Sequence, residues 1–252
     1  MSDRKIALIT GGSRGLGRAD ALALADTGVD AILTYRTGRD GAEQVVRDIE
    51  AKGGKAVALP LDTSVVSSFA DFAAQVREAL SSTWGAERFH VLVNNAGIAH
   101  VAPFAETTEA DFDAMVNVHF KGPFFLTQTL LPLLADGGSI VNYSTGLTRF
   151  VAEGSSAYAS MKGAVEVLSK YQAKELGKRG IRVNAVAPGP TATDFGGGFM
   201  KSDQFRAGAG SQIALGRVGE PEDIGEAIAA LVSDAGRWIT AQRIEVSGGA
   251  LL

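Results

Sequence analysis

Ile6-Ala-Leu-Ile-Thr-Gly-Gly-Ser-Arg-Gly-Leu-Gly17 places a short apolar run directly before a glycine-rich loop. An apolar run that stops at glycine predicts a buried strand over residues 6–10, and residues 18–27 have a helical pattern. In this order, small residues let a pyrophosphate approach the backbone, and the helix N-terminus offers N–H donors and a positive dipole end. The spacing of Gly11, Gly15 and Gly17 therefore predicts a dinucleotide-binding loop, with a simple tight turn as the alternative.

Short apolar runs and helical stretches continue to alternate along the chain. Each apolar run ends in small or polar residues, as the buried strands of a parallel sheet do. Further strands are predicted at 31–35, 56–61, 90–93, 139–143, 181–186 and 243–246. Helices are predicted at 42–52, 65–80, 111–134 (kinked or divided by Pro123 and Pro132), 155–176 and from Pro221 onward. We therefore predict an α/β fold over residues 1–252: a single Rossmann-like domain with a doubly wound seven-stranded parallel sheet and helices on both faces.

The end of the second predicted strand indicates which dinucleotide binds. A site for NAD carries a carboxylate near this strand end, where it hydrogen-bonds the ribose 2′-hydroxyl. Here Tyr35-Arg-Thr37 contains none, and Arg36 can bind a 2′-phosphate through two parallel hydrogen bonds. Arg14, inside the glycine loop, can reach the same phosphate from the other side. Two arginines without an acid favour NADPH or NADP⁺ as the cofactor, unless both are ordinary solvated surface residues.

Two further strand ends bring small or polar residues to the same edge of the sheet. Asp62 follows the third strand, where it can accept a hydrogen bond from the adenine amino group. Equally, Asp62 or Thr63 can cap the next helix, and the two roles can coexist. Asn94-Asn-Ala-Gly97 follows the fourth strand, and its small residues would let the cofactor ribose lie close, with a plain turn as the alternative.

The stretch Tyr158-Ala-Ser-Met-Lys162 carries the candidate chemistry. A tyrosine and a lysine four residues apart lie on the same face of a helix. An ammonium group beside a phenol favours the phenolate and lowers its pKa, so that the pair could exchange a proton with a substrate oxygen. Ser144 and Thr145 follow the fifth strand, where a hydroxyl can hold a carbonyl oxygen. The alternative is an ordinary surface pair at helical spacing.

Composition excludes several other classes of protein. The net charge is −4 without a basic block, so the chain shows no nucleic-acid footprint. Cysteine is absent, which excludes thiolate chemistry and fits a reducing compartment. The first apolar run is too short for a signal peptide or a membrane span, so a cytoplasmic location and no membrane partner are expected. The three histidines lack metal-ligand spacing, so no metal is expected; His90 and His119 are interpreted as structural, and His100 is a weak candidate for the substrate cleft.

Residues 191–215 are predicted to form a mobile lid over the substrate. A glycine-rich, aromatic-bearing segment of this length is unusual inside a compact domain. Several large side chains would form an apolar or aromatic pocket wall, or simply pack within the lid: Tyr143, Phe150, Phe195, Phe199 and Met200.

With these segments in place, the sequence resembles the short-chain dehydrogenase/reductase family over nearly its whole length. The motifs that carry the resemblance follow the family's order: Thr10-Gly11-x-x-x-Gly15-x-Gly17, Asn94-Asn95-Ala96-Gly97, Asn117, Tyr158-x-x-x-Lys162, Asn184 and Pro188-Gly189. The most similar subgroup depends on NADP(H) and includes 3-oxoacyl-carrier-protein reductases and ketoreductases. The resemblance also implies a homotetramer, or a homodimer, that uses the segment from Pro221 onward.

The resemblance implies a role for each matched residue. Tyr158 would protonate a carbonyl oxygen, Lys162 would tune it and bind the nicotinamide ribose, and Asn117 would hold a relay water. Residues 188–193 would bind the carboxamide, although Thr191 stands where an aliphatic residue is more usual. The cofactor-binding set would be Gly11, Ser13, Arg14, Gly15, Leu16, Gly17, Arg36, Asp62, Thr63, Asn95, Ala96, Gly97, Tyr158, Lys162, Pro188, Gly189, Thr191 and Thr193.

One departure from the family leaves a choice open. Thr145 occupies the position of the family's catalytic serine, and Ser144 lies one residue earlier. We favour Thr145, since adjacent strand residues point to opposite faces, with Ser144 as the alternative.

The function expected from these features is reversible reduction of a ketone or aldehyde by NADPH. Two alternatives remain: an NAD-dependent alcohol, sugar or steroid dehydrogenase, or an NADP(H)-binding protein without catalysis.

Overall fold

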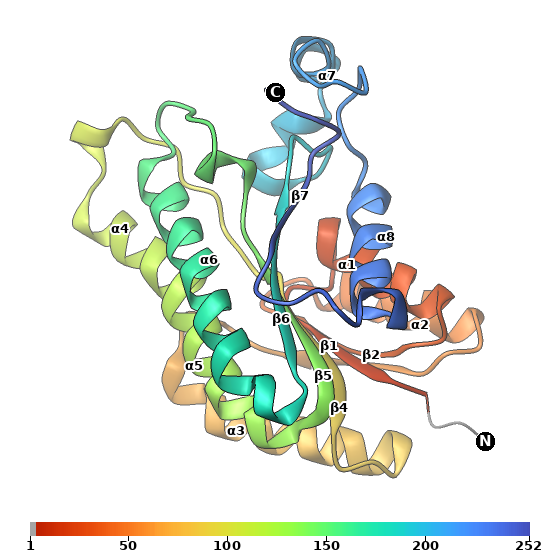
Figure 1. Cartoon of the computed structure of the whole chain (residues 1–252). Coiled ribbons are helices and arrows are strands. Elements are labelled where there is room, and N and C mark those ends of the chain that lie inside the picture. Colours follow the sequence, from red (N-terminus) through yellow and green to blue (C-terminus); the bar gives the residue numbers. More distant parts are fainter. Residues whose placement is uncertain (1–3) are drawn as a thin grey trace.

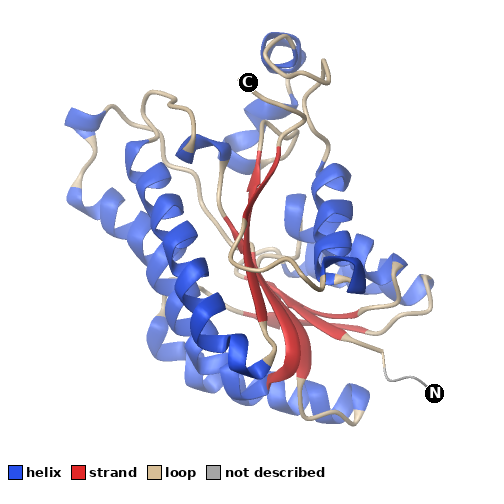
Figure 2. Ribbon diagram, in the orientation of Figure 1, coloured by secondary structure: helices blue, strands red, loops and turns tan. Residues whose placement is uncertain are grey.

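The computed structural model describes residues 4–252. Its centre is a seven-stranded sheet in the order β3-β2-β1-β4-β5-β6-β7, in which every neighbouring pair is parallel (Figures 1 and 2). The strands are β1 (Ile6–Ile9), β2 (Asp30–Tyr35), β3 (Ala56–Pro60), β4 (Phe89–Asn94), β5 (Leu134–Tyr143), β6 (Arg182–Pro188) and β7 (Arg243–Val246). The predicted α/β class and the doubly wound parallel sheet are confirmed.

Helices cover both faces of this sheet (Figure 1). One face carries α1 (Gly15–Asp26), α2 (Arg39–Ala51) and α8 (Pro221–Val232). The other face carries α3 (Phe69–Ala79), α5 (Gly122–Leu130) and α6 (Ser156–Leu176), with α4 (Glu109–Val116) beside α6. The short α7 (Asp203–Gly210) stands beyond the carboxyl ends of the strands. No helix between residues 4 and 252 is both long and apolar enough to cross a membrane.

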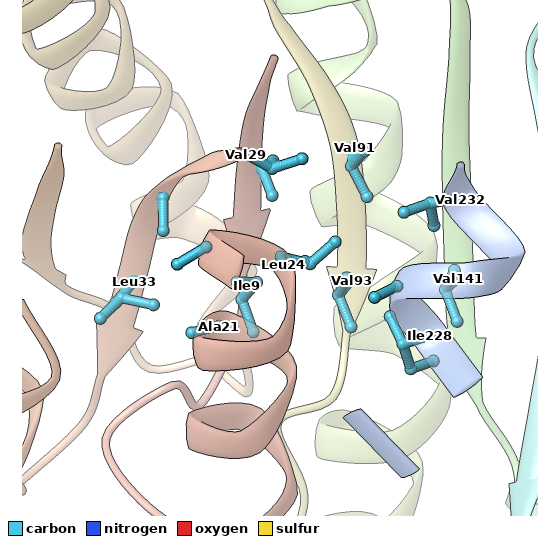
Figure 3. Packing of buried hydrophobic residues seen from close by; sticks show 14 of the residues in the cluster. Ile9, Ala21, Leu24, Val29, Leu33, Val91, Val93, Val141, Ile228 and Val232 are labelled. Atoms are coloured by element: carbon cyan, nitrogen blue, oxygen red, sulfur yellow. The ribbon is translucent and has the colours of Figure 1, made fainter. Parts of the chain in front are cut away.

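The continuous apolar runs of the strands are explained by burial on both faces. Along β1, Ile6 and Leu8 belong to one apolar cluster, whereas Ala7 and Ile9 belong to the other, and all four are buried. Successive side chains of a strand point to opposite faces, so both faces of β1 need an apolar cover. Figure 3 shows one cover: residues of α1 and α8, such as Leu24 and Ile228, pack against Ile9, Val93 and Val141 of the sheet.

The strand order creates a crevice at one end of the sheet. From β1 the chain builds outward through β2 to β3, and then crosses to β4 on the other side of β1. The loops that follow β1 and β4 therefore diverge, and ligands of open α/β sheets bind at this point, beyond the carboxyl ends of the strands.

The helix predicted over residues 111–134 differs most from the structure. A π-helical turn at Asn117–Lys121 separates α4 from α5, and Pro123 lies in the first turn of α5, directly after this wider turn. The chain then leaves the helix after the 3-10 turn Leu131–Leu133, which contains Pro132, and β5 begins at Leu134. The predicted division is correct, but the last residue assigned to the helix is the first of a strand.

A buried carboxyl group joins α1 to the sheet. Asp20 is fully buried, and the hydroxyl of Tyr143 on β5 lies 2.8 Å from each of its carboxyl oxygens. Burial raises the pKa of Asp20 to about 8, although the hydrogen bond with Tyr143 acts in the opposite direction. Asp20 therefore stays protonated at neutral pH in the folded protein, whereas in the unfolded chain it ionises at about pH 4.

This pair makes stability depend on pH with a definite sign. Between pH 4 and pH 8 the folded protein keeps a proton that the unfolded chain releases, so the contribution of Asp20 to stability falls as pH rises. An Asp20→Asn variant keeps a neutral side chain that can hydrogen-bond Tyr143. Its stability relative to wild type is expected to rise by roughly 2–5 kcal/mol from pH 4 to pH 8, as measured by urea unfolding.

Asp26→Asn, on the exposed end of the same helix, is the control and should show little pH dependence. If the free energies of unfolding of Asp20→Asn and wild type differed by the same amount at every pH from 4 to 8, this would contradict a protonated Asp20.

Candidate active site

A cavity of about 710 Å³ opens at the carboxyl ends of the strands. The loops after β1 to β6 all contribute to it. The structure brings most of the predicted site residues together there: Gly11, Ser13, Arg14, Gly15, Leu16, Arg36, Asp62, Thr63, Asn95, Ala96, Gly97, Ser144, Thr145, Tyr158, Lys162, Pro188, Gly189, Thr191 and Thr193. Gly17 and Asn117 do not line it.

The glycine loop fits a pyrophosphate in two respects. Gly11 has a φ of +69°, and a Cβ atom there would lie 3.1 Å from the Ala96 Cα atom, so the backbones of the two loops approach closely. The first turn of α1 contains no acidic residue, and no side chain caps its N–H groups. These free donors and the helix dipole form an anion site.

Gly17 packs closely against the loops after β1 and β4, and its predicted contact with the cofactor stays a prediction. It is buried, and a Cβ atom there would lie 2.4 Å from the carbonyl oxygen of Gly11. The Asn95 side-chain amide donates to the carbonyl oxygens of Thr10 and Gly11, at 2.8 and 3.2 Å. The loops after β1 and β4 are therefore joined directly.

The adenosine end of the cavity carries the two predicted arginines. Arg14 and Arg36 are exposed at its rim, and within residues 4–252 neither forms a salt bridge. Arg36 acts on Asp62 through its charge alone. Arg36-Thr-Gly38, directly after β2, contains no carboxylate, so this rim suits a dianionic 2′-phosphate.

Asp62 stabilises its own loop. Its Oδ1 atom accepts hydrogen bonds from the Ser64 hydroxyl at 2.6 Å and from the Ser64 backbone N–H at 2.9 Å. Burial raises the pKa of Asp62, but these hydrogen bonds and the charge of Arg36 outweigh it and hold the pKa below its ordinary value. The prediction that Asp62 or Thr63 caps the next helix is wrong, because Val65 and Ser68 precede the next helical turns and neither has a side-chain cap.

The candidate catalytic side chains come from α6 and the end of β5. Tyr158 and Lys162 lie one turn apart on α6, and the Lys162 Nζ atom is 5.7 Å from the centre of the Tyr158 ring. Lys162 is buried and donates to the Tyr143 carbonyl oxygen at 2.7 Å. The Thr145 side chain lies close enough to the Tyr158 hydroxyl to lower its pKa, and its own hydroxyl accepts from the Leu147 backbone N–H at 3.3 Å. The Ser144 hydroxyl instead donates to Glu166 at 2.5 Å, so it points away from Tyr158.

Burial dominates the pKa values of both α6 residues. It raises the pKa of Tyr158 to about 12, although the neighbouring Thr145 side chain acts in the opposite direction. Burial also lowers the pKa of Lys162 to about 7. The expected lowering of the Tyr158 pKa by Lys162 is therefore not found in the protein alone, since a half-neutral lysine exerts little charge and desolvation disfavours the phenolate.

His119 is interpreted from the sequence as structural, without any place in the site. It is buried in the cavity wall, its ring is perpendicular to that of Tyr158 at 5.0 Å between centroids, and its Nε2 atom donates to the Ile98 carbonyl oxygen at 2.8 Å. Burial and the charge of Lys162 lower its pKa to about 3, so His119 is neutral. Its position two residues after Asn117, in the same π-helical turn, was the available signal.

One other prediction needs correction: His100 does not line the cavity, and its Nδ1 atom lies 3.7 Å from an Asp111 oxygen. Of the two alternatives for the large apolar residues, Phe199 shows packing within the lid, on Phe205, whereas Tyr143, Phe150, Phe195 and Met200 line the cavity. Asn117 is half-buried in the π-helical turn that packs against α6, and its role as the holder of a relay water stays a prediction. Within residues 4–252, no group of three or more potential metal ligands gathers.

Comparison with known proteins identifies the family. The profile described as "Enoyl-(Acyl carrier protein) reductase" matches residues 11–250. The 3-oxoacyl-[acyl-carrier-protein] reductase FabG of Staphylococcus aureus is 36% identical over 251 residues, covering 99% of both chains. An uncharacterised oxidoreductase of Methylorubrum extorquens is 39% identical over 250 residues, or 97% of each chain. This chain belongs to the short-chain dehydrogenase/reductase family.

Solved structures show which members of this family the chain resembles. The angucycline C-6 ketoreductase LanV, with bound NADP, superposes with a TM-score of 0.93 at 37% identity, covering 98% of this chain and 95% of LanV. The promiscuous reductase LugOII, which catalyses keto-reduction at C1 during lugdunomycin biosynthesis, gives a TM-score of 0.93 at 35% identity, with 98% of both chains covered. This chain is thus an oxidoreductase similar to ketoreductases.

The cofactor rim yields a direct test of Arg36. Arg36→Asp removes the guanidinium and adds a repelling carboxylate. The ratio of the dissociation constants for NADH and NADPH is expected to fall about 100-fold, because charge-assisted hydrogen bonds to the 2′-phosphate are lost. Titration of the reduced nicotinamide fluorescence measures both constants. Arg39→Asp, at the exposed start of α2 and outside the cavity, is the matched control; an unchanged ratio in Arg36→Asp would exclude Arg36 from phosphate recognition.

Proposed function

We propose that this protein reduces a ketone or aldehyde to an alcohol with NADPH, with Tyr158 as the general acid. The observation that carries the proposal is the grouping of Tyr158 with Lys162 and Thr145, inside a cavity whose far rim presents Arg14 and Arg36. The protein is an NADP(H)-dependent oxidoreductase, in keeping with relatives whose structures hold NADP or NADPH.

The residues of the cavity suit NADPH from end to end. Arg14 and Arg36 would bind the 2′-phosphate, and the free N–H groups at the start of α1 would bind the pyrophosphate. The adenine would lie near Asp62 and Thr63, the ribose groups near Asn95, Ala96 and Gly97, and the carboxamide near Pro188, Gly189, Thr191 and Thr193. When bound, the reduced nicotinamide supplies a hydride to the carbonyl carbon.

Side chains of the protein itself would carry out the proton transfer. The Tyr158 hydroxyl would donate its proton to the carbonyl oxygen, while the Thr145 hydroxyl would donate a hydrogen bond to the same oxygen and keep it in place. Lys162, with a pKa near 7, can return a proton toward Tyr158 at neutral pH, with Asn117 holding the water that reaches solvent. Run backward, the same groups would remove a proton from an alcohol, so the reaction is reversible.

The cavity walls favour a substrate with an apolar body. Phe150, Phe195 and Met200 line the same cavity as Tyr158, and the Phe195 ring lies 6.0 Å from that of Tyr158. A second cavity shares Leu147 and Val151 with the first and continues away from the cofactor side. LanV has been solved with rabelomycin as well as NADP. An aromatic or polycyclic ketone would fill these spaces better than a small sugar.

Residues 191–215 are proposed as a lid over the substrate. The segment contains 3-10 turns within Phe195–Lys201, interrupted by a kink, and then α7. Three consecutive glycines, Gly196, Gly197 and Gly198, have φ values of +67°, +87° and +81°, which other residues rarely adopt. A hinge at this point would move Phe195 and Met200 toward or away from Tyr158.

A homotetramer or homodimer is proposed for the assembly, with a cytoplasmic location. Trp238 before β7 and Leu252 after it are 95% and 96% exposed. Large apolar residues left open to water suit subunit contacts.

The central prediction concerns Tyr158. Tyr158→Phe is expected to lower turnover with NADPH by at least about 100-fold, because general acid catalysis contributes that much or more. NADPH binding should change little, since the phosphate-binding residues are distant. The assay follows the nicotinamide absorbance with a panel of aliphatic, bicyclic and polycyclic aromatic ketones.

Tyr171→Phe removes a hydroxyl from the exposed side of the same helix and serves as the control. Near-normal turnover by Tyr158→Phe would refute the mechanism. Tight NADPH binding by wild type without turnover of any ketone would support a non-catalytic binding protein instead.

A further inference from the structure

Glu166 extends the row of functional side chains along α6. Positions 158, 162 and 166 are spaced by four residues, so they lie along one face of the helix. The Glu166 side chain is 17% exposed, and its Oε1 atom accepts three hydrogen bonds. The donors are the hydroxyls of Ser144 at 2.5 Å and Thr148 at 2.7 Å, and the Arg243 Nε atom at 2.8 Å.

Arg243 connects this carboxylate to the backbone of Thr145. From β7, its guanidinium donates through Nη2 to the Thr145 carbonyl oxygen at 3.2 Å and through Nη1 to Glu245 at 2.8 Å. Glu166 and Arg243 therefore hold the turn after β5 from two sides, one on a helix and one on an edge strand. Thr145 lies at the centre of that turn, in contact with Tyr158.

We propose that Glu166 and Arg243 form a positioning pair that selects Thr145, and not Ser144, as the hydroxyl that binds the substrate carbonyl. The inference rests on the proposed function. Ser144 and Thr145 both have hydroxyls and both contribute to the cavity wall, so side-chain chemistry alone does not separate them. Glu166 separates them, because it binds the Ser144 hydroxyl. The Thr145 hydroxyl instead accepts from the Leu147 N–H and keeps its proton available beside Tyr158.

The energetic reason is the burial of Ser144. Ser144 is only 3% exposed, and a buried hydroxyl without a partner is costly. Glu166 provides a charged acceptor, which forms a stronger hydrogen bond than a neutral one. Without this acceptor, the turn gains stability by moving to find Ser144 another partner, and the Thr145 hydroxyl moves with it. Small displacements of catalytic groups lower turnover strongly.

Two substitutions of Glu166 test the pair. Glu166→Leu removes the acceptor at similar volume, and Arg243 keeps Glu245 as a partner, so no guanidinium is left without a carboxylate. Its kcat for a ketone is expected to fall about tenfold, with the NADPH dissociation constant within about twofold of wild type. Glu166→Gln keeps an acceptor oxygen and should recover part of the lost kcat. Glu175→Leu and Glu175→Gln, at an exposed site on α6, are the matched controls.

Repeating the Glu166 substitution in a Thr145→Ala variant separates a positioning role from general destabilisation. If Glu166 acts through Thr145, Glu166→Leu should lower kcat about tenfold in the wild type but less than about twofold in a Thr145→Ala background. A merely structural role would give the same factor in both backgrounds. Glu166→Gln can replace Glu166→Leu in this comparison if the leucine variant does not fold.

The outcomes distinguish the inference from the proposed function. A tenfold loss of kcat in Glu166→Leu that is absent in the Thr145→Ala background supports the positioning pair. Wild-type kcat in both Glu166 variants, or equal losses in both backgrounds, overturns it even when Tyr158→Phe is inactive. Full activity of Tyr158→Phe would instead refute the proposed function.

Discussion

The burial of a lysine and a tyrosine side by side is the constraint on which the site depends. Lys162 is 5% exposed, and its ammonium donates to the backbone carbonyl of Tyr143. Desolvation lowers the pKa of Lys162 to about 7 and raises that of Tyr158 to about 12. Both shifts favour a neutral pair, because an uncompensated charge is costly away from water. A neutral phenol is a proton donor, so the protein alone is already prepared to protonate a carbonyl oxygen.

The parallel arrangement of the strands is what brings these groups together. All seven strands point the same way, so their carboxyl ends gather the phosphate loop, the cofactor rim and Thr145 at one edge. The apolar runs of the strands hold this edge rigid, because both faces of the sheet are covered by helices. The more distant contacts of β7 through Arg243 then refine the turn that carries Thr145.

Much of this arrangement could be predicted from sequence because its signals are local. The run Ile6–Ile9 and the following glycines specify a strand and a phosphate loop within about a dozen residues. The position of Ser144 could not be predicted in this way, because it depends on Glu166, 22 residues away, and on a different element. The pKa of Tyr158 was misjudged for a related reason: helical spacing shows that Lys162 is near, but not that both side chains are buried. His119 resembled an ordinary core histidine until its ring was seen against Tyr158.

The most direct test of this account is a crystal structure of the protein with NADP⁺ and a ketone bound. The account predicts the carbonyl oxygen within about 3 Å of both the Tyr158 and the Thr145 hydroxyl oxygens, with the Ser144 hydroxyl still on Glu166. A carbonyl oxygen bound by other groups, or a Tyr158 hydroxyl turned away from the cavity, would contradict it.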